Sequence, residues 1–144
     1  MAPQQGSRMY HATALLLPNG QVLSAGQDDG PLAKSGELFS PPYLFRGPRP
    51  TIADAPATVS RGERLQFTSP EASDLANVVL IRAGSATHEI DTDQRSVPLS
   101  FSASGSAVDA QVPADANVIP RGFYMLFVVN AAGVPSVAPW IRVI

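Results

Sequence analysis

The sequence contains no cysteine, and this absence excludes several kinds of chemistry at once. The chain can form no disulfide, offers no thiolate nucleophile and supplies no thiolate metal ligand. Any metal site built from this chain must therefore use nitrogen and oxygen donors. The same absence leaves the redox compartment of the protein open.

Charged residues are also scarce, at 15% of the chain against about a quarter in typical domains. The formal net charge is −2, so no basic surface is available to neutralise phosphates. Apolar runs of membrane-spanning length and basic amphipathic helices are missing too. We therefore expect neither a nucleic-acid partner nor a membrane partner. The opening MAPQQGSRMY lacks a basic segment followed by an apolar one, so we expect no signal peptide within this sequence.

The sequence is rich in turn residues and has no long segment of helical period. Its fourteen prolines and eleven glycines are spread along the chain, which favours many short strands and an all-β fold. From Pro50 onward, apolar runs recur about every ten residues, as is typical of an immunoglobulin-like sandwich. Prolines 48 and 50 mark a boundary between residues 1–48 and 49–144. The sandwich strands are predicted at residues 51–52 with 57–59, 63–69, 76–82, 97–102, 107–112, 122–130 and 136–143.

Before this boundary the sequence predicts a small antiparallel unit. Strands are expected at residues 10–17, 21–25 and 36–40. The first two are joined by Pro18-Asn19-Gly20, because Asn-Gly readily adopts the positive φ angles that a tight turn needs.

Residues 78–101 form the stretch that we expect to organise the site. An apolar run at residues 78–81 predicts a strand buried on both faces, followed by the small residues 83–86. His88, one of only two histidines, comes next, and the chain returns through residues 97–101. The sequence therefore predicts a hairpin that presents one imidazole at its tip.

The predicted strand at residues 122–130 is apolar on both faces, so something must cover its second face. The sequence leaves open whether crossing loops or the N-terminal hairpin cover this face. We expect an exposed patch or a self-association contact either at Tyr124, Leu126 and Val128 or at Leu15 and Leu17.

Tyr10, His11 and His88 are the candidate metal ligands, because imidazole nitrogen and phenolate oxygen suit copper(II) or iron. No local motif links the two histidines, and neighbours on a regular strand point to opposite faces. Tyr10 and His11 can therefore share one ion only at a strand end or an irregular turn. Two hydrogen-bonded histidines beside a packed tyrosine are the alternative. A calcium loop at Glu89, Asp91 and Asp93 is disfavoured, because the EF-hand pattern is incomplete.

Four ordered segments resemble the C-terminal part of the kelch-type copper radical oxidases, the family of galactose oxidase and glyoxal oxidase. They are RMYHATALLLPNG (8–20), ELFSPPYL (37–44), GSATHEIDTDQR (84–95) and GFYMLFVVNAAGVPSVA (122–138). The resemblance implies a kelch propeller followed by an immunoglobulin-like early-set domain. It also implies secretion or a periplasmic location, and oxidation of a primary alcohol, aldehyde or sugar by O₂ with release of hydrogen peroxide.

The same resemblance assigns roles to the candidate ligands. Tyr10 matches an axial tyrosine that accepts the alcohol proton, and His11 and His88 match the two copper-binding histidines. The family's redox partner is a second tyrosine crosslinked to a cysteine, which this chain lacks. A kelch blade takes about 50 residues, so residues 1–48 match only the remnant of a last blade.

We therefore expect a C-terminal fragment or domain of such an oxidase, with part of the copper site but no activity alone. The missing propeller, or a second copy bound at an uncovered face, is the expected partner. The alternative is a non-catalytic structural or carbohydrate-associated module with vestigial histidines.

Overall fold

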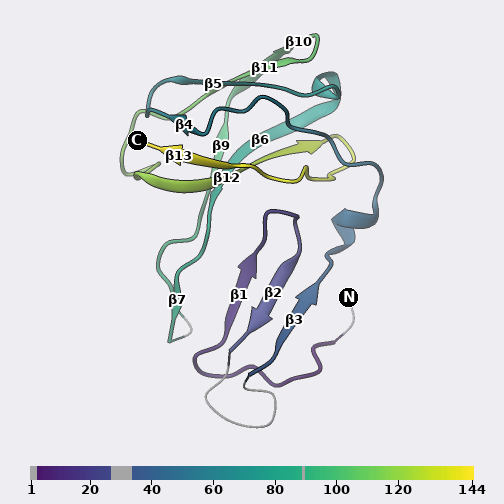
Figure 1. The fold of residues 1–144 in the computed structure, drawn as a ribbon, viewed down its shortest axis with the longest axis vertical. Helices are drawn as coiled ribbons and strands as arrows, with labels where there is room; N and C mark the ends of the chain where they lie inside the picture. Colours follow the sequence, from purple (N-terminus) through teal and green to yellow (C-terminus); the bar gives the residue numbers. More distant parts are fainter. Residues whose placement is uncertain (1–2, 27–33, 89) are drawn as a thin grey trace.

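A computed structural model describes residues 3–26, 34–88 and 90–144. It consists of a small three-stranded sheet below a larger two-sheet sandwich, with a narrow two-stranded arm descending beside the small sheet (Figure 1). The described residues contain no α-helix, only two short 3₁₀ turns, η1 (Pro42–Phe45) and η2 (Ala72–Asp74). The predicted all-β class is confirmed.

The small sheet has the antiparallel order β1 (Thr13–Leu16), β2 (Val22–Ala25) and β3 (Gly36–Phe39). Its first turn is the predicted one, because the Gly20 N–H donates to the Leu17 carbonyl at 2.8 Å. Gly20 has a φ of 81°, a conformation that glycine adopts without strain. The first strand begins at Thr13 and not at residue 10, since Tyr10 and His11 form a turn.

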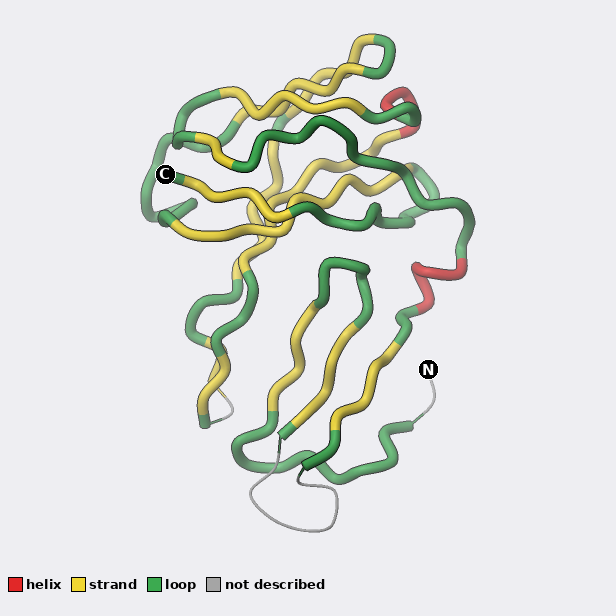
Figure 2. The backbone as a smooth tube through the Cα atoms, viewed as in Figure 1, coloured by secondary structure: helices red, strands yellow, loops and turns green. Residues whose placement is uncertain are grey.

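The sandwich pairs a three-stranded sheet with a five-stranded one (Figures 1 and 2). Strand β4 runs parallel to β13, and the other pairs in these two sheets are antiparallel. The first sheet has the order β10 (Phe101–Ser104), β11 (Ala107–Gln111), β5 (Arg64–Thr68), and the second has the order β4 (Thr58–Val59), β13 (Trp140–Val143), β12 (Gly122–Asn130), β6 (Leu75–Arg82), β9 (Arg95–Leu99).

One predicted strand, residues 97–102, is in fact two strands in different sheets. Strand β9 ends at Leu99 and β10 begins at Phe101, so the chain crosses from one sheet to the other at Ser100. The Ser100 carbonyl accepts a hydrogen bond from the Gln111 N–H at 2.8 Å, which satisfies the backbone at the crossing. The alternating pattern continues through the crossing without a turn residue, and this is why the sequence pattern did not reveal it.

The main core lies between the two sheets and is lined by inward-facing side chains of both. Tyr124, Leu126 and Val128 of β12 are fully buried there, so the expected exposed patch at these residues is wrong. The alternative patch residues Leu15 and Leu17 are half-buried. The Tyr124 hydroxyl donates to the Pro120 carbonyl at 2.8 Å, the tyrosine corner of immunoglobulin-like sandwiches.

The second face of β12 is covered, as the sequence predicted. Met125 and Phe127 are buried there against Ala138, which precedes β13, and Leu16 of β1 packs on the same cluster. A crossing segment and the N-terminal hairpin therefore share the cover. Phe123, at the start of the strand, stays 61% exposed.

Beyond the sandwich, β6 continues into the arm, formed by β7 (Ala86–Thr87) and β8 (Ile90–Asp91). The arm lies beside the end of β1 that points away from the sandwich (Figures 1 and 2). In the described part of the chain, we find no helix with the length and apolar character needed to cross a membrane.

Deleting residues 1–48 should leave a cooperatively folded sandwich, because every buried residue of the main core lies beyond this segment. Loss of Leu16 from the Met125–Phe127 cluster should cost about 1–2 kcal/mol, or roughly 5–15 °C in Tm. Calorimetry and near-UV circular dichroism check this. A non-cooperative melt without near-UV signal would show that the N-terminal segment is needed for folding.

Candidate metal centre

The rings of Tyr10, His11 and His88 converge at the junction of the small sheet and the arm. Ring centroids are 4.2 Å apart for Tyr10 and His11, 5.5 Å for Tyr10 and His88, and 4.6 Å for the two histidines. All three residues are exposed at this junction. The structure thus brings together the three candidate ligands that the sequence predicted from separate segments.

Neighbouring Tyr10 and His11 point to one place because they lie in an irregular turn. The Ala12 N–H donates to the Met9 carbonyl at 3.0 Å, and His11 has a φ of 62°. His88, at the tip of the arm, has a φ of 51°. Positive φ is uncommon for residues other than glycine and is enriched at functional sites, where the surrounding structure holds it.

The His88 ring is oriented by its neighbour Thr87. The Thr87 hydroxyl and His88 Nδ1 are 2.7 Å apart, within hydrogen-bond distance. When Nδ1 carries the proton and donates to this hydroxyl, the lone pair of Nε2 stays available to a metal ion.

Asp91 braces the base of the His88 tip. Its Oδ1 accepts backbone N–H groups of Ser85 at 3.0 Å, Asp93 at 3.1 Å and Gln94 at 3.0 Å. These bonds, with that of Gln94 foremost, lower the pKa of the Asp91 carboxyl. Asp91 therefore orders a turn, and Asp93 is paired with Arg82 at 3.0 Å. Glu89, the third member of the disfavoured calcium set, lies outside the described residues.

A cavity of about 290 Å³ opens between the arm and β1. Its lining includes both histidines, and its other walls are small or apolar: Ala12, Thr13, Leu15, Gly84, Ala86 and Thr87. The site is therefore a cleft between two parts of the chain, not a pocket within one of them.

The separation of the two imidazoles matches that of two rings on adjacent coordination positions of one ion. With metal–nitrogen bonds of about 2.0–2.1 Å, two imidazoles at right angles on one ion would have centroids roughly 4.5 Å apart. The observed separation is 4.6 Å. The described residues contain no group of three or more His, Cys, Asp or Glu side chains arranged for a metal ion. The candidate donors that meet here are two histidines and a tyrosine, a combination that suits copper(II).

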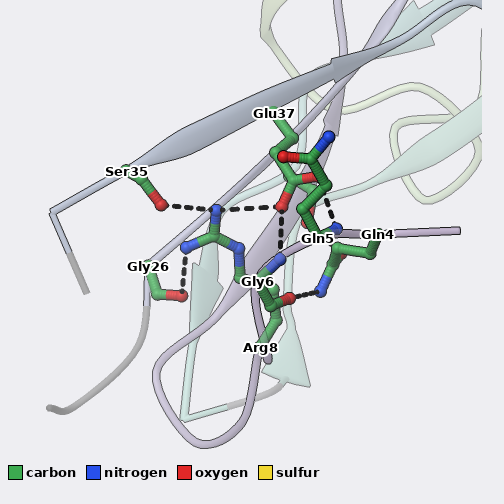
Figure 3. A network of polar contacts seen from close by, with 8 residues as sticks. Gln4, Gln5, Gly6, Arg8, Gly26, Ser35 and Glu37 are labelled. Atoms are coloured by element: carbon green, nitrogen blue, oxygen red, sulfur yellow. Dashed lines mark hydrogen bonds and ion pairs between the residues drawn. The ribbon is translucent and has the colours of Figure 1, made fainter. Parts of the chain in front are cut away.

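The segment that leads into Tyr10 is held by a polar network around Glu37 of β3 (Figure 3). The Glu37 carboxylate accepts the N–H groups of Gln5 at 2.9 Å and Gly6 at 3.1 Å. These bonds, with that of Gln5 foremost, lower the pKa of Glu37. Arg8, whose side chain is only 5% exposed, contacts Glu37 at 3.5 Å and the Ser35 hydroxyl at 3.0 Å.

At the other end of β1, the turn Pro18-Asn19-Gly20 is held by residues outside the hairpin through three consecutive carbonyls. They accept from the Ala138 N–H at 2.9 Å, from Arg49 at 2.8 Å and from the Tyr43 hydroxyl at 2.6 Å, respectively. We call these contacts the hairpin-tip latch. Desolvation lowers the pKa of Arg49 and raises that of Tyr43.

Sequence reasoning did not single out Arg49 or Tyr43 for any role. Both lie in the proline-rich segment after β3, and nothing in its pattern shows that side chains there reach back to the earlier turn. Tyr43 was in a segment that carries the family resemblance, which was the only available signal.

Fold and site together define a class: an immunoglobulin-like sandwich with an attached small sheet, which together hold two histidines and a tyrosine. A family model described as the galactose oxidase-like early set domain matches residues 49–143. The chain belongs to this family.

Several relatives of the chain are named as oxidases. It is 38% identical to a galactose oxidase of Gibberella zeae over 98% of its length, and 36% identical to the aldehyde oxidase GLOX of Vitis pseudoreticulata over 100%. A fungal alcohol oxidase solved in complex with copper matches 99% of the chain with 35% identity and a TM-score of 0.88. The chain spans only 22%, 31% and 32% of these three proteins, respectively.

Replacing Asp91 with alanine should loosen the His88 tip, because three backbone N–H groups lose their acceptor. Faster amide exchange at Ser85, Asp93 and Gln94 would show this by NMR. Asp91→Asn, which keeps an acceptor oxygen, should rescue most of the protection. Asp93→Ala is the matched control, since it removes the same charge from the same turn.

The same protection should depend on pH with a defined sign. A lowered folded-state pKa means that the ionised Asp91 stabilises the turn above its unfolded pKa, about 3.9. This contribution is lost as the pH falls through the lower folded-state value. Protection that is unchanged in acid, or in Asp91→Ala, would contradict the bracing role.

Proposed function

We propose that this chain is the C-terminal part of a copper radical oxidase, and that Tyr10, His11 and His88 are its copper ligands. The observation that carries the proposal is the convergence of these three rings from two segments, with the two imidazoles 4.6 Å apart. The oxidase names of the relatives and the copper in the fungal alcohol oxidase support it.

The proposed reaction converts a primary alcohol to an aldehyde, or the hydrate that an aldehyde forms with water to an acid, while O₂ is reduced to hydrogen peroxide. A bound copper ion would supply an acceptor for one of the two electrons that leave the substrate. His11 and His88 hold the ion, and Thr87 keeps the His88 ring oriented through Nδ1. The Tyr10 phenolate oxygen takes the proton of the substrate hydroxyl.

The second electron needs another acceptor. The resemblance assigns that role to a tyrosine crosslinked to cysteine, and this chain has no cysteine. We therefore propose that this acceptor belongs to a part of the protein outside residues 1–144. The substrate is a small alcohol, aldehyde or sugar, and a secreted or periplasmic location is proposed from the family.

We also propose that residues 1–48 are the remnant of a last kelch blade, and that the rest of a propeller is the partner of this unit. The small sheet supports this, since propeller blades are antiparallel sheets of four strands and the described part has three. Its exposed apolar side chains, with Leu38 60% exposed on β3 and the nearby Phe45 76% exposed, fit a surface that is normally covered.

The chain alone should bind copper(II) weakly, and binding should depend on both histidines. Groups that hold ligands in place are worth about 10- to 100-fold in metal affinity, and a propeller would supply such groups. Titration followed by EPR should show nitrogen coupling that is lost in His11→Ala and in His88→Ala. Gln94→Ala, an exposed change in the turn that follows β8 of the arm, is the control.

The same samples should release no hydrogen peroxide with primary alcohols or glyoxal-type aldehydes. Copper(II) accepts a single electron, and the chain has no cysteine with which to build the second acceptor. Peroxide release that disappears in His88→Ala would prove this expectation wrong. Tight copper binding that survives both histidine changes would favour the non-catalytic module instead.

Without a propeller, the small sheet should self-associate at high protein concentration. The order β1-β2-β3 leaves one side of β3 without a strand partner in the described chain, and unpaired strand edges invite pairing. Sedimentation velocity should show a concentration-dependent dimer that Leu38→Lys weakens. An equally exposed change on the sandwich, Phe123→Lys on β12, should leave it intact. A strict monomer at millimolar concentration argues against this surface.

A further inference from the structure

The two histidines of the candidate site belong to parts of the chain that share no strand pairing. His11 precedes β1 of the small sheet, whereas His88 lies on the arm that continues β6 of the sandwich. In the described residues, the small sheet and the sandwich form separate sheets. The separation of the two rings therefore depends on how the hairpin is docked, and we infer that Arg49 is the positioning residue that sets it. This inference rests on the proposed function only for the statement that the two rings bind a metal.

Arg49 is the member of the hairpin-tip latch that joins the most backbone groups. Its guanidinium donates to the Asn19 carbonyl at 2.8 Å, to the Pro135 carbonyl at 2.8 Å and to the Ser136 carbonyl at 2.5 Å. The planar guanidinium holds three acceptors in one rigid arrangement, which a lysine ammonium does not do. Arg49 therefore ties the tip of the hairpin to the segment before β13.

The sandwich side of this contact is anchored in the strand next to β6. Ser136 is fully buried, its N–H donates to the Val128 carbonyl at 2.8 Å, and its hydroxyl accepts the Val128 N–H at 3.1 Å. Val128 of β12 pairs directly with Val78 of β6, the strand that continues into the arm. A continuous hydrogen-bonded path thus runs from the hairpin tip through Arg49 to the element that carries His88.

The geometry of the hairpin makes this contact sensitive. Strand β1 and the turns at its two ends separate Asn19 from His11 by at most roughly 25 Å, at about 3.3 Å per residue, so a tilt of only about 2–4° at the tip moves His11 by about 1 Å. Metal–ligand distances tolerate only about 0.2 Å. The hairpin also contacts the sandwich through Leu16, which packs on the Met125–Phe127 cluster. This contact is apolar and non-directional, so it opposes separation of the hairpin from the sandwich more than it opposes a tilt of the hairpin.

The test measures the docking of the hairpin without metal. Because the chain has no cysteine, Leu38→Cys on β3 and Ile90→Cys on β8 give two specific sites for spin labels. Both side chains are exposed, at 60% and 61%. Double electron–electron resonance at low protein concentration should give one narrow distance distribution. Arg49→Ala should broaden it, and Arg49→Lys should broaden it less.

Arg64→Ala is the matched control. Arg64 pairs with Asp109 on an exposed part of the sandwich, so the change removes the same charge without touching the latch. Tyr43→Phe removes only the hydrogen bond to the Gly20 carbonyl and should broaden the distances less than Arg49→Ala. Should Arg49→Ala not fold, as judged by near-UV circular dichroism, Arg49→Lys and Tyr43→Phe decide the question through the same distances.

Copper(II) affinity then tests the consequence for the site. Arg49→Ala should lower it about tenfold, and in a His11→Ala background it should have no further effect. A different result tests the proposed function: it is wrong if His11→Ala and His88→Ala leave the copper affinity unchanged. In that case the distances between the spin labels still decide whether Arg49 positions the hairpin. The inference is wrong if folded Arg49→Ala gives a distance distribution as narrow as that of the parent protein. It is also wrong if Arg49→Ala lowers the copper affinity of the His11→Ala variant as much as it lowers that of the parent.

Discussion

The docking of the Pro18-Asn19-Gly20 turn onto the sandwich is the contact on which the candidate site depends. Three successive carbonyls of one turn each accept a hydrogen bond from a residue outside the hairpin. Three directional hydrogen bonds to one turn, of which that at the buried Gly20 would be costly to leave unmade, favour one orientation of the turn over others. The far end of the hairpin, with Tyr10 and His11, follows from that orientation.

Local strain completes the arrangement that docking begins. His11 and His88 both have positive φ, and each lies next to a short hydrogen-bonded feature that holds it, the turn from Met9 to Ala12 and the Asp91 brace. Neither conformation would persist in an isolated peptide at no cost. Two strained tips meeting from different segments are hard to explain as packing alone, because both rings remain exposed.

Much of the fold was predictable because it follows from local pattern. The Asn-Gly turn, β3 and the full extent of β12 follow from turn chemistry and apolar alternation, and the comparisons confirm the early-set family. The crossing at Ser100 was missed, since alternation does not say which sheet a strand joins. For the site, the resemblance and donor chemistry indicated the three rings. The latch at Arg49 was not predictable, because contacts between distant segments leave no periodic trace in one sequence.

The division of the site between two separately formed units also has a thermodynamic consequence. An ion that needs both histidines binds only when the hairpin is docked on the sandwich. A ligand that binds one of two states stabilises that state, so the binding free energy of the ion adds to the stability of the docked state. The hairpin would then be fixed at both ends, by hydrogen bonds to the backbone of the Gly20 turn and by metal coordination at His11. Metal loading would act as a measure of assembly, and removal of the metal would release the end of the hairpin that lies farthest from the sandwich.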